Sequence, residues 1–159
     1  MSRDSDTPQL EAASTAGSEF EWNRLVGWVS FVVGAGSGLV MGLWSFEGPV
    51  ATPALLGDYA DVSRRLARLG HVAFFGLGIL NILLARELPT MTLGMRAKRV
   101  AAAAMTLGNV FLPLTLLAAA VYHPVKYLMP FPATSVFVAL SIAVYGVWRG
   151  TGNLGDARR

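Results

Sequence analysis

The sequence predicts an all-α integral membrane protein, a four-helix bundle whose helices run antiparallel in up-down-up-down order. Of its 159 residues, 53% are hydrophobic and only 14% are charged. The mean hydropathy of +0.50 is too apolar for an ordinary soluble domain of this size. Four largely uncharged windows approach or exceed the length of about 20 residues that crosses a bilayer. Such apolar runs form helices, because hydrocarbon offers the backbone no other hydrogen-bond partner.

The chain divides into a polar N-terminal tail (1–23), a membrane domain (24–149) and a short C-terminal tail (150–159). The N-terminal tail is acidic, unlike the cationic start of a signal peptide, so we expect it to be disordered and uncleaved. The connections after the second and third windows are short, which makes sequence neighbours antiparallel. We place the four helices at residues 25–46, 66–85, 100–123 and 127–148.

The first window carries a stripe of small residues at every fourth position, which lie on one helix face. Another helix can approach closely there. Two interpretations follow: the stripe packs against another helix of the same chain, or it is a homodimer seam or a docking face for a larger complex. Under either interpretation, replacing Gly38 with Leu should disrupt the contact between the stripe and its partner helix. The stripe consists of Ser30, Gly34, Gly38 and Gly42.

The second window holds the main candidate ligand, His71. Arg64, Arg68 and His71 follow i, i+4, i+7 spacing and therefore share a helix face. An imidazole there could bind haem iron while the arginines bind carboxylates, and the same column would suit a quinone or a lipid headgroup. The alternative is structural: His71 hydrogen-bonds a neighbouring helix or interfacial water, and the arginines contact outer-leaflet phosphates.

His123 is predicted to end the third helix, because Pro124 disfavours helical geometry in the residue before it. Since the second and third helices are antiparallel, His71 and His123 belong to the same leaflet and form the candidate pair for haem b or a metal. Cysteine is absent, which removes thiolate metal sites and c-type haem attachment. The stretch around His71 is similar to the second helix of haem-copper oxidase core subunits, where a histidine near the outer surface precedes an apolar, glycine-containing run; this resemblance makes haem the first ligand to test.

The other polar residues favour structure over catalysis. Asn81 and Asn109 are expected to find interhelical partners. No Asp or Glu falls inside the four windows, so the carboxylate relay of a proton pump is missing, and no hydrolase or nucleotide-binding motif is present. The leading hypothesis is a non-catalytic accessory or structural subunit of a membrane complex. The alternatives are a b-type haem- or quinone-binding redox protein that uses His71, and a small carrier or channel.

The basic residues lie beside the apolar windows, which indicates membrane topology rather than a nucleic-acid site. By the positive-inside bias we expect both termini to be cytoplasmic, in a bacterial inner membrane, with the 45–62 loop outside. The expected partners are the lipid bilayer and either another membrane protein or a second copy. We expect residues 95–99 to bind anionic headgroups, and the alternative is a binding site for a soluble acidic partner. Nine of the thirteen Lys and Arg residues lie on the predicted inner side: Arg3, Arg24, Arg86, Arg96, Lys98, Arg99, Arg149, Arg158 and Arg159.

Overall fold

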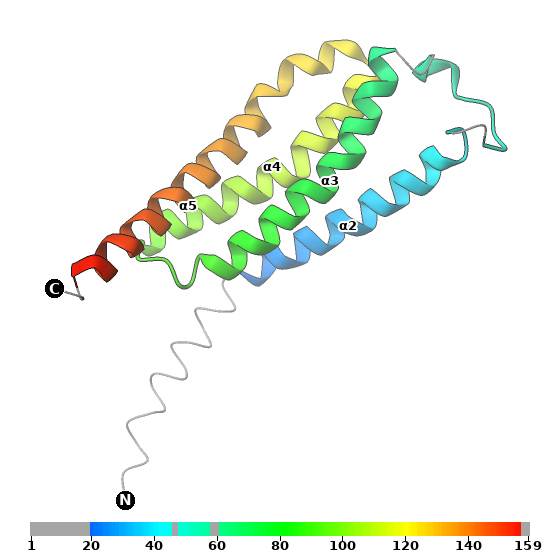
Figure 1. Cartoon of the computed structure of the whole chain (residues 1–159). Helices are drawn as coiled ribbons and strands as arrows, with labels where there is room; N and C mark the ends of the chain where they lie inside the picture. The colour runs from blue at the N-terminus through cyan, green and yellow to red at the C-terminus, as the bar shows by residue number, and fades with distance from the viewer. Residues whose placement is uncertain (1–19, 46–47, 58–60, 157–159) are drawn as a thin grey trace, which may run out of the picture.

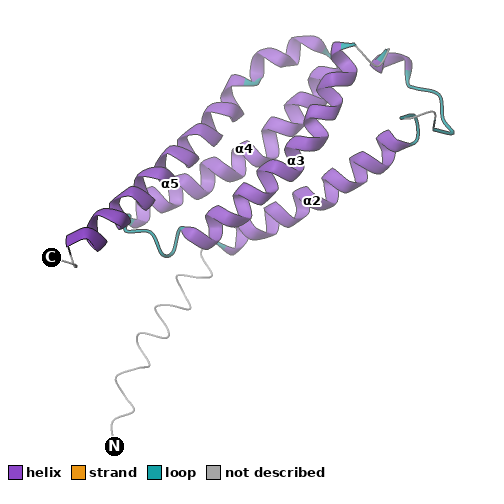
Figure 2. Cartoon of the chain, in the orientation of Figure 1, coloured by secondary structure: helices purple, strands orange, loops and turns teal. Residues whose placement is uncertain are grey.

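The structure, a computed structural model, describes residues 20–45, 48–57 and 61–156, with side chains described up to residue 150. Within these ranges all regular structure is helical and no strand is present (Figure 2). Two short 3-10 helices, η1 (Ala54–Leu56) and η2 (His123–Leu128), lie in the connections. The four long helices are α2 (Glu21–Gly42), α3 (Val62–Glu87), α4 (Met95–Val121) and α5 (Pro130–Asp156).

The four long helices confirm the predicted antiparallel up-down-up-down bundle (Figure 1). Each has 22 to 27 residues and is therefore about 33 Å long or longer, enough for about 30 Å of hydrocarbon. All four are also apolar enough to cross a membrane. The chain is an integral membrane protein whose apolar outer surface contacts lipid. We call the end at which α2 begins and α5 finishes the terminal end, and the opposite end the loop end.

The helix ends differ from the predicted windows by a few residues. Helices α2, α3 and α4 begin four, four and five residues before the predicted starts, and α5 runs past residue 148. Hydropathy detects the edge of the hydrocarbon, whereas a helix continues through the interface, where long charged side chains reach water. Phe46, most of the N-terminal tail (1–19) and residues 157–159 lie outside the described residues.

Helices α3 and α4 form the central pair of the bundle. Helix α2 packs mainly against α3 and also touches α4, whereas α5 packs mainly against α4. Figure 1 shows α2 and α5 on opposite sides of this pair. The buried core lies toward the terminal end, where the connection between α3 and α4 folds beneath the helices. Its members are Phe20, Leu84, Ala85, Leu88, Met91, Ala101, Ala102, Met105 and Ala139.

Glycines lie where the helices approach most closely. A Cβ atom added to Gly27 of α2 would lie 2.8 Å from the carbonyl oxygen of Gly78 in α3. A Cβ atom added to Gly70 would lie 3.1 Å from the carbonyl oxygen of Pro113, where α3 meets α4. The first distance is shorter than real Cβ contacts and the second is tighter than most of them, so the backbones of the paired helices approach closely at both glycines. Close backbone approach at small residues is the usual way in which membrane helices associate.

Candidate functional site: the polar seam of α2

Helix α2 carries three polar residues, Asn23, Ser30 and Ser37, spaced seven residues apart. Residues seven apart lie on nearly the same face of a helix, and this face points into the bundle. Asn23 and Ser30 are only 5% and 4% exposed. We call these three residues, together with the groups to which they bond on α3 and α4, the polar seam.

At the terminal end of the polar seam, Asn23 connects three helices. Its Nδ2 atom lies 2.8 Å from Oδ1 of Asn81 on α3. The same nitrogen lies 2.8 Å from the carbonyl oxygen of Ala102 and 2.8 Å from Oγ1 of Thr106, both on α4. The two hydrogens of one amide are therefore shared among three acceptors. A buried amide donor of this kind holds α2 to both of its neighbours.

In the middle of the membrane, the hydroxyl of Ser30 donates to Oδ1 of Asn109 on α4 over 3.1 Å. Asn81 and Asn109 are both fully buried, and the Nδ2 atom of each has no hydrogen-bond partner among the described residues. A buried donor without a partner costs about 1–3 kcal/mol. Both asparagines therefore act as acceptors in the polar seam, because the Oδ1 atom of each accepts a hydrogen bond from α2.

Nearer the loop end, His71 of α3 bonds to the backbone of α2. Its Nδ1 atom lies 2.9 Å from the carbonyl oxygen of Gly34 and 3.1 Å from Oγ of Ser37. A carbonyl oxygen only accepts, so this bond requires the proton on Nδ1, and in that tautomer the lone pair is on Nε2. This is also the tautomer that metal-ligating histidines adopt when Nδ1 donates to a carbonyl. The protonation state alone would therefore permit ligation through Nε2.

The packing around His71 does not fit a haem. A Cβ atom added to Gly38 would lie 2.6 Å from Cε1 and 3.3 Å from Nε2 of the imidazole, so the backbone of α2 covers this edge of the ring. Phe75 lies edge-on to the same ring, with the ring centroids 5.3 Å apart. A macrocycle bound through Nε2 extends well beyond that nitrogen on every side. It would collide with α2 unless α2 separated from α3.

His123 lies at the loop end of the bundle, as predicted, but two residues beyond the end of α4 rather than at it. Helix α4 ends at Val121, Tyr122 is extended with φ −130° and ψ 95°, and His123 is the exposed first residue of η2. The proline ring of Pro124 would clash with a carbonyl four residues earlier, so the α-helix ends before His123 rather than at it. No contact between His71 and His123 is found in the described structure. The predicted pair of ligands is therefore not assembled.

Three arginines, Arg64, Arg65 and Arg68, precede His71 on α3. His71 bonds to the backbone of α2, and Nη2 of Arg64 donates to the carbonyl oxygen of Trp44 over 3.4 Å, so the two side chains lie on the same side of α3, as their spacing predicts. This carbonyl follows the end of α2, where a cation favourably meets the helix dipole. Arg68, in contrast, lines a shallow hollow of about 340 Å³ together with Arg65, Leu69 and Val72. Arg64 therefore contacts the backbone just after the C-terminal end of α2, whereas Arg68 lines a surface hollow.

Three of the four predicted stripe residues of α2 face inward. Ser30 bonds to α4, and Gly34 and Gly38 pack against the aromatic and imidazole rings of α3. A Cβ atom added to Gly34 would lie 3.2 Å from the Cβ atom of Phe74. Gly42 differs, because nothing lies within 4 Å of a Cβ atom added there. Within this chain, most of the stripe is thus occupied by α3 and α4.

Two residues of this interface, Asn23 and Gly27, are not singled out from the sequence. Asn23 is assigned there to the polar tail, although it is buried in the first turn of α2. The signal that could have identified it is its spacing: Asn23, Ser30 and Ser37 repeat every seven residues. Gly27 precedes the predicted stripe by three residues, which is also a helical spacing. Both residues continue the inward face of α2 toward the terminal end.

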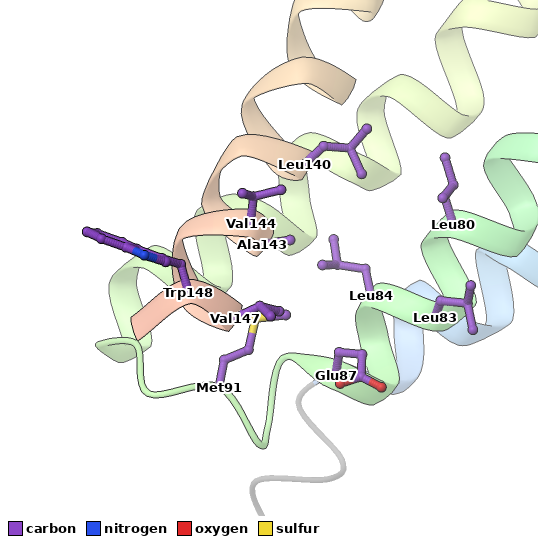
Figure 3. Close-up of a pocket in the computed structure, with 10 residues that line it drawn as sticks. All are labelled: Leu80, Leu83, Leu84, Glu87, Met91, Leu140, Ala143, Val144, Val147 and Trp148. Atoms are coloured by element: carbon purple, nitrogen blue, oxygen red, sulfur yellow. The ribbon is translucent and has the colours of Figure 1, made fainter. Parts of the chain in front are cut away.

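Two of the hollows on the surface of the bundle are open grooves of similar volume. The α3–α5 groove has a volume of about 460 Å³ and an almost wholly apolar lining (Figure 3). The α2–α4 groove has a volume of about 470 Å³ and includes polar side chains. The α3–α5 groove is lined by Leu80, Leu83, Leu84, Glu87, Met91, Leu140, Ala143, Val144, Val147 and Trp148.

No protein family model, curated protein or solved structure matches this chain. Among the described residues, no group of three or more His, Asp or Glu side chains could hold a metal ion. The function of the protein is therefore inferred from the polar seam and from the two grooves.

Proposed function

We propose that this chain is a non-catalytic structural subunit of a membrane complex and that it supports a transmembrane helix of another subunit. The polar seam carries this proposal. The interior side chains that could bind a substrate or cofactor bond instead to one another and to backbone carbonyls across three helices. A carrier or channel needs polar groups that face a path, whereas hydrogen bonds between helices hold the helices in place.

The proposed orientation places both termini in the cytoplasm of a bacterial cell. Arg24, Arg86, Arg96 and Arg149 lie at the terminal end of the bundle, whereas Arg64, Arg65, Arg68 and Lys126 lie at the loop end. Further cations at positions 98 and 99 also lie at the terminal end. The excess of Lys and Arg favours the terminal end as the cytoplasmic one. Arg3, Arg158 and Arg159 lie outside the described residues.

The proposed docking site is the α3–α5 groove, and its proposed occupant is an apolar transmembrane helix with a cation at its cytoplasmic end. In Figure 3, Leu84 points across the gap toward α5, and Glu87 lies at the terminal end of the groove. Glu87 is the only charged residue in the lining and is exposed. Transmembrane helices carry Lys and Arg at their cytoplasmic ends, so Glu87 is complementary in charge to such a helix.

We expect gentle detergent extraction followed by native mass measurement to find a second membrane polypeptide in fixed ratio to this chain. Replacing Val144, which lines the groove and is 70% exposed, with Trp should fill the groove and lower partner retention about tenfold. The matched control is Val32→Trp, because Val32 is 73% exposed on α2 and lines neither groove. A stable monomer without a partner, or equal retention by both variants, would contradict the proposal.

A further inference from the structure

We infer that the α2–α4 groove binds one anionic phospholipid from the leaflet at the terminal end of the bundle. The lipid phosphate is bound by Arg99, and one acyl chain lies along the apolar wall of the groove. This inference is independent of the proposed partner, because the α2–α4 and α3–α5 grooves share no lining residue.

The apolar wall of the groove suits an acyl chain. Its two aromatic side chains from the start of α2 are Phe20 and Trp22, and α4 contributes Leu107 and Phe111. Trp22 is 65% exposed and lies in the first turn of α2, at the depth where tryptophan side chains meet lipid headgroups. The wall therefore begins at the interface and continues into the hydrocarbon, as an acyl chain does.

The floor of the groove offers a hydroxyl group deeper in the membrane than Arg99. Thr106 Oγ1 accepts a hydrogen bond from Asn23 over 2.8 Å, and its own proton has no acceptor among the described residues. Thr106 lies seven residues after Arg99 on α4, which is about 10 Å deeper in the membrane. A phospholipid carries its ester carbonyls below its phosphate. The Thr106 hydroxyl thus lies on the same side of Arg99 as these carbonyls and the acyl chains.

The cationic side chains at residues 95–99 lie in different surroundings. Lys98 is only 8% exposed, and its Nζ donates to the carbonyl oxygen of Pro89 over 3.0 Å, so it faces the connection between α3 and α4. Arg99 lines the groove, whereas Arg96 is exposed and does not line it. An arginine fork can bind two phosphate oxygens at once. Arg99 is therefore the headgroup ligand within this cluster.

The test uses the purified full chain in detergent, with phosphatidylglycerol and phosphatidylcholine added separately and bound lipid counted by native mass spectrometry. We expect one phosphatidylglycerol per chain and no comparable retention of phosphatidylcholine. Arg99→Gln should weaken phosphatidylglycerol binding about fivefold, whereas Arg96→Gln should change it less than about twofold. Thr106→Val should weaken phosphatidylglycerol binding less than Arg99→Gln does, because it leaves the phosphate ligand in place.

Circular dichroism would establish that each variant keeps its helix content. Equal retention of the two lipids would overturn the inference, as would equal losses for the Arg99→Gln and Arg96→Gln variants. Competition by millimolar inorganic phosphate would assign the site to a free anion instead of a lipid. A chain that loses its partner but keeps its phosphatidylglycerol would contradict only the proposed function.

Discussion

Replacing Gly27 with Leu should lower the free energy of unfolding by about 3 kcal/mol. A Cβ atom at this position would lie 2.8 Å from the backbone oxygen of Gly78 and 2.5 Å from Cγ1 of Ile82. Ile82 can rotate, but the backbone of α3 cannot move aside without separating from α2. Equilibrium unfolding in mixed detergent micelles, followed by circular dichroism, would measure the loss.

The matched control for this substitution is Gly36→Leu on the same helix. Nothing lies within 4 Å of a Cβ atom added to Gly36, so the new side chain would extend into open space. Leucine favours helix over glycine by up to about 1 kcal/mol, and we expect this variant to be as stable as the parent or slightly more stable. If the Gly27 and Gly36 variants unfold at the same denaturant concentration, α2 does not meet α3 at Gly27.

Replacing His71 with Ala should lower the free energy of unfolding by about 2 kcal/mol. The change removes the hydrogen bond to the carbonyl oxygen of Gly34 and leaves a cavity beside Gly38. His123→Ala is the matched control, because His123 is exposed at the start of η2, and its effect should stay within about 0.5 kcal/mol. The same unfolding measurement applies to both variants.

An absorption spectrum distinguishes this structural role of His71 from ligation. Protein purified from a haem-replete host should show no Soret band, because α2 covers the edge of the imidazole that haem iron would have to reach. A Soret band that disappears in the His71→Ala variant would show that α2 separates from α3 to admit a haem.

Hydropathy and charge predict much of this fold, because they report directly on the cost of placing a side chain in hydrocarbon. The four helices and their antiparallel order follow from the uncharged windows and the short connections. Periodicity also predicts which residues share a face, as it does for His71, which bonds to α2, and Arg64, which bonds to the carbonyl of Trp44 just after α2. These features depend on the chain's local sequence.

The choice of neighbour for each helix face could not be predicted in this way. Lys98 and Arg99 are adjacent in the sequence, yet one is buried beside Pro89 and the other lines a groove. That difference depends on how α4 is rotated against α3, which the periodicity of a single helix does not encode. The burial of Asn23 could not be predicted for a similar reason. A polar residue at the edge of an apolar window is assigned to the adjacent polar tail unless its hydrogen-bond partners on α3 and α4 are known.

The most direct test of the inward-facing stripe is oxidative cross-linking of the Gly34→Cys/Phe74→Cys double variant in native membranes. The protein contains no other cysteine, and a Cβ atom at Gly34 would lie 3.2 Å from that of Phe74, so a small shift of α2 reaches the separation of about 3.5–4.5 Å found in disulfides. We expect a disulfide within one chain that leaves the protein at monomer mass, and no cross-link in the Gly36→Cys/Phe74→Cys control. A disulfide-linked dimer, or cross-linking of the control alone, would contradict the packing of α2 against α3.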